Sequence, residues 1–307
     1  MKARNLHLDT LKGVLIILVI LGHVITRVDG SHFSQRLYDF IYFFHMPLFV
    51  YISGFLTKKK PDMASFKKGL MGILIPFFIF QIIHMTIGAF QGKTVDLEYF
   101  VIPRWTLWYL LSLAYWKTFI QFCADKVDRH PIAFMGISIA LCLLSGLIPA
   151  GKVLSIQRTF HFLPFFMFGY YSRQGFIRMP VINRWIALAI SVIFASLLFT
   201  DIFPSDTRAL LFGSKDYDFD RILAKAVIVA CSAGMCISMF NLISESSVVA
   251  RIGQQSQKIY LSHALLIIFA MPLFDRFEMP VDHIVFSIIY TLIILGASLL
   301  VCIPFRR

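Results

Sequence analysis

The sequence predicts an all-α protein, a polytopic membrane bundle of about ten transmembrane helices, and three observations support this fold class. Of its 307 residues, 58% are hydrophobic and 15% are charged, and the mean hydropathy is +0.75. Soluble domains have about 45–50% apolar and about 25% charged residues, so this chain is too apolar for a water-exposed surface. Its apolar residues gather in runs of about 17–25 residues, the length that crosses the hydrocarbon core. These features exclude an ordinary cytosolic enzyme, a secreted disulfide scaffold and a disordered protein.

Ten ranges satisfy this length and hydropathy pattern. The sixth is short, and its start is left open back to Val153. The first carries Lys12 and His23 and precedes nine further spans, so we do not expect it to be a cleavable signal peptide. In order, the predicted spans are 11–27, 40–57, 70–90, 106–123, 131–149, 159–172, 182–200, 222–244, 258–274 and 283–304.

The charges of the connecting segments predict the topology. With the N-terminus in the cytoplasm, the inner segments hold 17 basic and five acidic residues, whereas the outer segments hold 11 basic and 12 acidic residues. The remaining basic residue, Lys117, lies within the fourth predicted span. This asymmetry is the positive-inside pattern, so both termini are expected in the cytoplasm. It also accounts for the net charge of +12, and no nucleic-acid partner is expected.

The connecting segments are short, and the longest, 201–221, is too small for a soluble domain. We therefore expect a single membrane domain over residues 1–307. The five cysteines are odd in number and show no CxxC or Cys/His spacing, which argues against a disulfide framework and a metal site.

The first span carries the clearest chemical signal. Lys12 and His23 are eleven residues apart, which places them within about 20° on one helix face and about 16 Å apart along the axis. Asp9 falls on the same stripe. A cation at the cytosolic mouth can hold a phosphorylated cofactor, and a histidine deeper along that face can move a proton. The alternative is that Lys12 extends to the interface and His23 bonds a carbonyl.

Other polar residues fall in the outer half of the predicted spans. His45 lies at a depth similar to that of His23, and His84, Arg158 and His161 also lie toward the outer side. Their convergence would make a polar chamber, although each histidine can equally be a packed residue that bonds a backbone carbonyl. Trp108 either belongs to an interfacial aromatic belt or stacks on a sugar.

The inner side carries the densest basic segment, KKKPDMASFKK, between the second and third spans. Its charge either sets orientation or clamps the phosphates of a nucleotide-bearing donor, for which Lys67 and Lys68 are best placed. His263 is expected near the inner face, and a bond to a neighbouring group is favoured over contact with a donor.

Several stretches resemble the acyltransferase-3 membrane family. LDTLKGVLIILVILGHV is similar to the first span of that family, whose hallmark is a basic residue, ten intervening residues and a histidine. FHMPLFVYISGFL resembles the second-span motif and puts His45 in its histidine position. LIPFFIF, WTLWYLLSL, FHFLPFFMFGYYSR and IGQQSQKIYLSHALLI are weaker echoes, so the resemblance runs from about residue 6 to 270. The subgroup resembled is that of fucose 4-O-acetylase-like proteins.

The resemblance implies O-acyl transfer in the bacterial plasma (inner) membrane, with polysaccharide modification as the outcome. An acyl group, commonly acetyl, would pass from cytoplasmic acetyl-CoA or another acyl-CoA to a hydroxyl of a cell-surface glycan or lipid-linked sugar. His23, assisted by His45, would be catalytic as a base or an acyl carrier. Lys12, Lys67 and Lys68 would bind the donor, and Trp108, Arg158 and His161 the acceptor. No permanently bound cofactor is expected, and homo-oligomerisation is left open.

One departure concerns the donor site. The family often carries two arginines three residues apart on the cytosolic loop, whereas this chain has Lys67 and Lys68 in that region. Lysines bind phosphate as point charges and lack the bidentate geometry of arginine.

The alternatives to an enzyme are a transporter or flippase of a glycan or lipid, and a non-enzymatic subunit of a membrane assembly.

Overall fold

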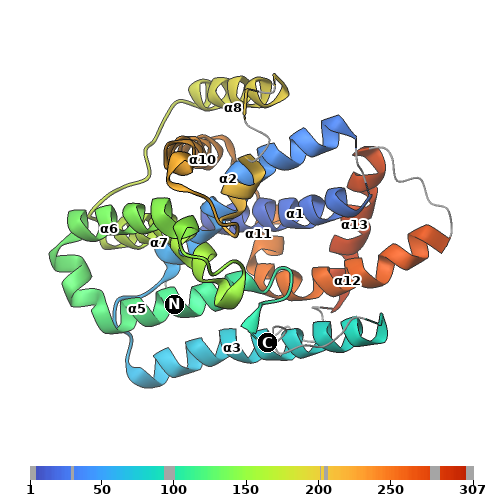
Figure 1. Cartoon of the computed structure of the whole chain (residues 1–307), viewed down its shortest axis with the longest axis horizontal. Helices are drawn as coiled ribbons and strands as arrows, with labels where there is room; N and C mark the ends of the chain where they lie inside the picture. Colours follow the sequence, from blue (N-terminus) through green and yellow to red (C-terminus); the bar gives the residue numbers. More distant parts are fainter. Residues whose placement is uncertain are drawn as a thin grey trace. The chain divides into compact units, whose positions relative to one another are not determined.

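The structure is a computed structural model, and it describes residues 5–28, 31–92, 101–200, 202–203, 207–276 and 284–301. Over these residues the chain forms helices and no strand, as the composition predicts (Figure 1). Five helices are long and apolar enough to cross a membrane. These are α1 (Leu6–Val28), α2 (His32–Leu56), α3 (Met63–Phe90), α10 (Ile222–Leu242) and α13 (Ile284–Val301).

The other five predicted spans also fall on helices: α5 (Trp108–Arg129), α6 (Pro131–Leu144), α7 (Ile156–Gln174), α8 (Arg184–Phe199) and α12 (Ser256–Arg276). With 14 and 16 residues, α6 and α8 are shorter than an upright span requires. The crossing of these five helices therefore stays a prediction. The cytoplasmic location of the termini also stays a prediction, since residues 1–4 and 302–307 lie outside the described residues.

The chain divides into two compact units. The first unit comprises residues 1–49, 180–205 and 231–307, and the second comprises residues 50–179 and 206–230. Helices α1, α8, α12 and α13 belong to the first unit, with the short α11 (Ser247–Gln254). Helices α3, α5, α6 and α7 belong to the second, with the short α9 (Thr207–Phe212) and the 3₁₀ turns η1 (Ser145–Leu147), η2 (Val153–Ser155) and η3 (Phe219–Arg221).

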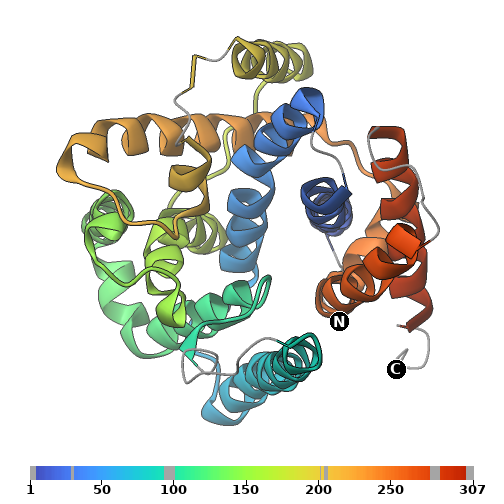
Figure 2. The same cartoon turned by 45° about the vertical axis from the view of Figure 1, so that its right-hand side comes forward.

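In the first unit, α1 packs against α11, α12 and α13. Figure 2 shows α1 nearly end-on, beside the orange and red α12 and α13. The crossing with α11 is close because both helices present glycine there. A Cβ on Gly13 would overlap the carbonyl of Val249, and one on Gly253 would overlap the carbonyl of Asp9. Small residues allow backbones to approach closely in this way within membranes, where apolar surface alone does not drive helices together.

In the second unit, α5 packs against α3 and α7, and α7 also packs against α6. The last turns of α2 meet α7 through another glycine pair, since Gly54 lies against the backbone of Phe166 and Gly169 against that of Tyr51. Glycine at these two positions therefore permits the close approach of α2 and α7. The indole of Trp116 donates to the carbonyl of Thr159 at 3.1 Å, which joins α5 to α7 inside the unit.

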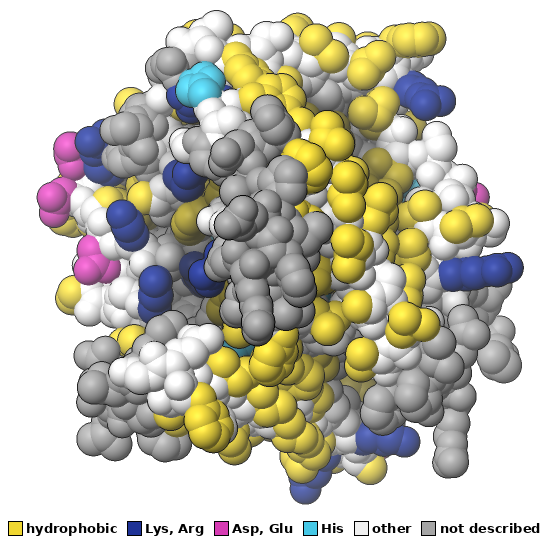
Figure 3. All heavy atoms as spheres, turned by 90° about the vertical axis from the view of Figure 1, so that its right-hand side faces the viewer, with side chains coloured by type: hydrophobic (Ala, Val, Ile, Leu, Met, Phe, Trp, Pro, Cys, Tyr) yellow, Lys and Arg dark blue, Asp and Glu magenta, His cyan; other side chains and the backbone are white. Residues whose placement is uncertain are grey.

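Large apolar side chains are exposed along the candidate spans, as expected for surfaces that face lipid rather than water. Phe78 and Ile82 of α3 are 58% and 60% exposed, and Leu292 of α13 is 58% exposed. Hydrophobic side chains make up much of the surface drawn in Figure 3. A contiguous apolar surface of this kind would be insoluble, so it supports the assignment to a membrane.

The basic segment between α2 and α3 is shorter than the sequence predicts. Helix α3 begins at Met63, seven residues before the predicted span, because Asp62 caps it by accepting the backbone N–H of Ser65 at 2.9 Å. That N–H bond lowers the pKa of the Asp62 carboxyl. Lys67 and Lys68 therefore lie in the first turns of a helix rather than in a loop.

Candidate functional site

The start of α1 carries a matched pair of charges. Lys12 Nζ lies 2.6 Å from Asp9 Oδ1, which confirms that the two side chains share one stripe of the helix. The amide of Gln254 on α11 donates to the other Asp9 oxygen at 3.4 Å. Asp9 is buried and Lys12 is partly exposed. Pairing offsets the cost of burying the carboxylate, and it also leaves Lys12 with less net charge to offer an anionic ligand.

Toward the other end of α1, His23 lies against a second histidine. Its ring is stacked on that of His263 from α12, with centroids 5.5 Å apart and planes 27° from parallel. His23 is half-buried, whereas His263 is fully buried. Nδ1 of His263 lies 3.1 Å from the carbonyl oxygen of Ile259, one turn earlier on α12. A carbonyl can only accept, so Nδ1 carries the proton, and Nε2 holds the lone pair of the neutral ring.

This contact shows that His23 and His263 do not lie at the different depths that the sequence predicts. Residue counting placed His263 near the inner face and His23 toward the outer face, yet their rings are stacked. The counting assumed that the span at 258–274 starts at the membrane surface. Instead α12 begins at Ser256, directly after α11, which is itself packed closely on α1. The bond to a neighbouring carbonyl that we expected for His263 is present.

His45 shows the same anchoring pattern as His263. Its Nδ1 lies 2.8 Å from the carbonyl oxygen of Ile41, one turn earlier on α2, and the side chain is buried. The ring of Tyr42 packs edge-on against it, with centroids 4.5 Å apart. The protonated Nδ1 again leaves Nε2 as the acceptor, so this imidazole is held in one tautomer. A catalytic role for His45 stays a prediction.

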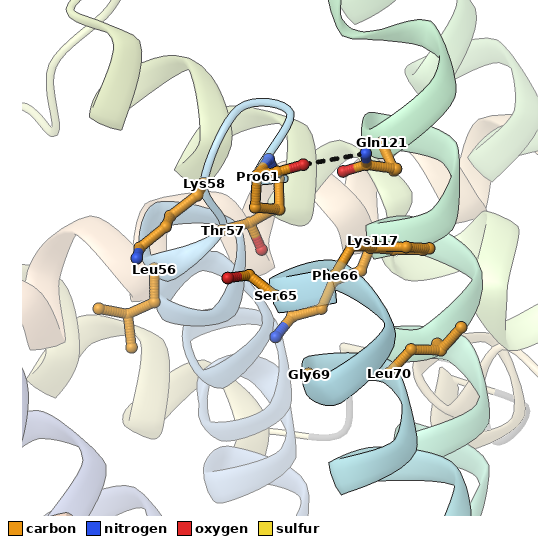
Figure 4. Close-up of a pocket in the computed structure, with 10 residues that line it drawn as sticks. All are labelled: Leu56, Thr57, Lys58, Pro61, Ser65, Phe66, Gly69, Leu70, Lys117 and Gln121. Carbon is orange, nitrogen blue, oxygen red and sulfur yellow. Dashed lines mark hydrogen bonds between the residues drawn. The ribbon is translucent and has the colours of Figure 1, made fainter. Parts of the chain in front are cut away.

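The second unit contains a cavity of about 250 Å³ between the end of α2, the start of α3 and α5 (Figure 4). Its lining includes two lysines and two hydroxyl-bearing residues, Lys58, Lys117, Thr57 and Ser65. Lys58 and Lys117 approach from different sides, as Figure 4 shows. Gln121 closes the wall by donating to the carbonyl of Pro61 at 3.1 Å. The ten lining residues include no carboxylate, so this cavity is suited to an anion.

The lysines beside this cavity differ in their pairing. Lys59 contacts Asp128 at 2.6 Å, Lys60 contacts Asp125, and the Asp128 carboxylate raises the pKa of Lys59. The hydroxyl of Tyr170 also donates to Asp128 at 3.0 Å. Lys67 and Lys68, the predicted donor-binding residues, are exposed and are not among the residues that line the cavity.

The predicted acceptor residues Trp108, Arg158 and His161 gather in the second unit. The Arg158 guanidinium lies 5.0 Å from the centroid of the Trp108 ring and donates to the Ser214 hydroxyl at 3.2 Å. Trp108 also stacks on Phe162, which packs edge-on against His161. Nδ1 of His161 lies 3.7 Å from Sγ of Cys142. The three residues thus form one polar–aromatic cluster at the start of α5 and α7, although their role as acceptor ligands stays a prediction.

The four histidines that the sequence places in one polar chamber are divided between the two units. His23 and His45 belong to the first unit, and His84 and His161 to the second. His84 is buried on α3, and Gln81 on the same helix donates to the carbonyl of Ile102 at 2.9 Å. A single chamber that combines all four would draw on both units, so it remains a hypothesis.

Residue counting missed two features of the site. Lys58 and Lys117 line the cavity, and Lys117 already stood out as a lysine inside a predicted span, a feature that marks functional sites in membrane proteins. His263 was singled out, but no local pattern could pair it with His23 across the chain.

A family model described as an acyltransferase domain matches residues 5–307. The nodulation protein NolL of Sinorhizobium fredii (strain NGR234) is 30% identical to this chain over 190 residues, which cover 56% of this chain and 49% of NolL. The nodulation protein NolL of Mesorhizobium japonicum is 28% identical over 190 residues, which cover 56% of this chain and 48% of that protein. The alignments thus span about half the length of these curated relatives. No solved structure matches this chain.

Proposed function

This chain belongs to the acyltransferase-3 family, and on that premise we propose that it is a membrane O-acyltransferase. The proposed reaction moves an acyl group, with acetyl as the expected one, from cytoplasmic acyl-CoA to a hydroxyl of a cell-surface glycan or lipid-linked sugar. Five apolar helices support a multi-pass membrane location, which we propose to be the bacterial plasma (inner) membrane. No permanently bound cofactor is needed for this chemistry.

The observation that carries the proposal is the position of His23 on α1. Its half-buried imidazole lies eleven residues after Lys12, on a helix otherwise lined by buried apolar residues, and it is stacked on a second imidazole. An ionisable group in such a span costs free energy, so its presence marks a candidate functional site. Imidazole also exchanges protons near neutral pH, which suits it to deprotonate a sugar hydroxyl.

Two chemical routes start from this histidine. In the first, a His23 nitrogen takes the proton of the acceptor hydroxyl while the acceptor oxygen attacks the thioester carbonyl. The C–S bond then breaks to release CoA thiolate. In the second, the nitrogen attacks the carbonyl carbon, the C–S bond breaks to release CoA thiolate, and His23 carries the acyl group. The acceptor oxygen then attacks that carbon, the N–C bond to His23 breaks, and the hydroxyl proton passes to the freed nitrogen. His45, with its tautomer held by Ile41, is proposed to complete the proton relay or to hold the acceptor.

The donor phosphates are proposed to dock on lysines. Lys67 and Lys68 at the start of α3 are exposed, and the nearby cavity offers Lys58, Lys117 and the hydroxyls of Thr57 and Ser65. Lys12 would contribute less because Asp9 already pairs with it. Ammonium groups bind phosphate as point charges, so a set of lysines replaces the bidentate arginine pair common in the family.

The acceptor is proposed to contact the cluster of Trp108, Arg158 and His161. Its indole face and guanidinium suit a sugar with hydroxyl groups, since aromatic faces pack on the apolar face of a sugar ring and arginine donates several hydrogen bonds.

The proposal is tested with purified protein in lipid nanodiscs, supplied with acetyl-CoA labelled in its acetyl group and a lipid-linked sugar. We expect release of free CoA thiol together with label on the sugar. Movement of unmodified glycan across proteoliposomes, without CoA release, would instead favour a transporter or flippase. Absence of both activities, with the protein folded and supplied with a broad acceptor panel, would favour a non-enzymatic assembly subunit.

A further inference from the structure

The His23–His263 contact carries an inference about how His23 works. His263 is 0% exposed, and a buried imidazole within a membrane helix is costly unless its polar atoms are satisfied. Packing alone would be served equally well by an apolar side chain at this position. His263 instead has a fixed tautomer and is stacked on His23, the histidine at the centre of the proposed reaction. Its presence there indicates a chemical role.

The geometry defines what His263 can do. The Ile259 carbonyl holds its Nδ1 proton and fixes the plane of the ring, and Tyr260 packs on it with centroids 5.8 Å apart. The ring of His23 lies against the face of this fixed ring. A neutral imidazole beside an imidazolium stabilises the cation through the lone pair at Nε2, the negative end of a dipole whose direction the Ile259 bond fixes, and a phenyl ring has no such dipole.

We propose that His263 is the positioning residue for His23, an inference that rests on the function proposed above. When His23 takes the proton of the acceptor hydroxyl, the oxygen bonds to the acyl carbon and the C–S bond of the thioester breaks. The imidazolium formed on His23 is held and stabilised by the neutral ring of His263, and it then returns the proton to the departing thiolate. His263 itself contacts neither substrate.

Three replacements of His263 test this role. His263→Asn keeps an N–H that can bond the Ile259 carbonyl, His263→Phe keeps a stacking ring, and His263→Ala leaves space for an added ring. We expect the Asn and Phe variants to lose ~10–100-fold in kcat, with the KM for acyl-CoA within about twofold of wild type. The matched control is His130→Asn at an exposed position of the second unit, which should keep wild-type kinetics.

A purely structural role is separated by chemical rescue of His263→Ala. Imidazole and pyrazole have the same size, but pyrazole is a far weaker base. We expect added imidazole to raise the kcat of His263→Ala at least tenfold and added pyrazole to raise it little. Equal rescue by both rings would mean that His263 only fills space, and unchanged kcat in the Asn and Phe variants would equally overturn the proposal.

A second readout does not depend on acyl transfer. Diethyl pyrocarbonate acylates neutral imidazole nitrogen with release of ethyl carbonate, so its rate at His23, followed by mass spectrometry, reports the nucleophilicity of that ring. We expect the rate at His23 to fall several-fold in His263→Phe relative to wild type and to stay unchanged in His130→Asn. An unchanged or faster rate overturns the role of His263. A slower rate in a protein that releases no CoA would instead support the histidine pair and refute the proposed reaction.

Discussion

The histidine pair of the first unit and the lysine cavity of the second arrange their polar groups in opposite ways. In the first unit the ionisable side chains are held by partners: Asp9 pairs with Lys12, and the Ile259 carbonyl and the His23 ring hold His263. In the second unit, Lys58 and Lys117 line a cavity of about 250 Å³ whose lining includes no carboxylate.

This difference separates two tasks. Chemistry at a reacting bond needs groups that are fixed before the reaction, because reorganising them costs rate. Docking of an anion tolerates flexible, strongly hydrated ammonium groups that adjust to the ligand. We therefore propose that the first unit carries the chemical step and that the second binds the donor. Kinetic variants at His23 and at the lysine cavity test that division, and one stability variant in each unit tests its packing.

The largest effect is expected at the fixed imidazole. His23→Gln removes the proposed proton acceptor while keeping polarity and similar size, so kcat for CoA release should fall by ~10²–10⁴-fold. The KM for acyl-CoA should change little, because His23 is assigned to the reacting bond and not to the donor phosphates. Steady-state kinetics with His130→Gln as the control measure both constants. Full activity in His23→Gln would contradict the assignment of chemistry to the first unit.

The opposite kinetic signature is expected at the cavity of the second unit. Lys117→Met and Lys58→Gln each remove one ammonium group, and a charge-assisted contact to phosphate is worth enough to raise the KM for acyl-CoA ~10–100-fold. Here kcat should stay near the wild-type value. Lys126→Gln, an exposed lysine in the last turn of α5, serves as the control. A fall in kcat without a change in KM would remove the distinction between the two units.

A smaller effect, on stability rather than activity, is expected where α1 crosses α11. The Cβ introduced by Gly253→Ala overlaps the carbonyl oxygen of Asp9, so the two helices must separate, at a cost of ~1–3 kcal/mol. Gly296→Ala on α13 is the matched control, since nothing lies within 4 Å of its added Cβ and alanine favours the helix. Thermal unfolding in detergent compares the two. Equal midpoints would show that the α1–α11 crossing is looser than described.

The smallest effect is expected at the cap of α3. The pKa of Asp62 is lowered by the Ser65 N–H, so its ionised form contributes stability above the unfolded pKa of about 3.9. That contribution is lost as the pH falls through the lower folded pKa. Asp62→Ala should therefore lower Tm by about a degree or two at pH 7 and leave it nearly unchanged near pH 3. A difference that persists at low pH would mean that the carboxylate is not the cap.

The sequence by itself determined the helices and the relations within them. Long apolar runs predicted the helical class, and residue spacing placed Asp9 and Lys12 on one stripe, because contacts three or four residues apart follow from helix geometry alone. The same spacing explains the bonds of His45 to Ile41 and of His263 to Ile259. Helix ends were predicted less accurately, since the start of α3 depends on a single polar side chain, the Asp62 cap.

Only the tertiary structure decided which residues meet. His23 and His263 are 240 residues apart in the chain, and their stacking depends on how α12 packs beside α1, where Gly13 and Gly253 bring α11 close. The cavity of Lys58 and Lys117 likewise arises from the packing of α5 against the first turns of α3. The periodicity of the sequence within one helix does not predict such contacts. Side chains on different helices meet only where the surfaces of those helices fit together.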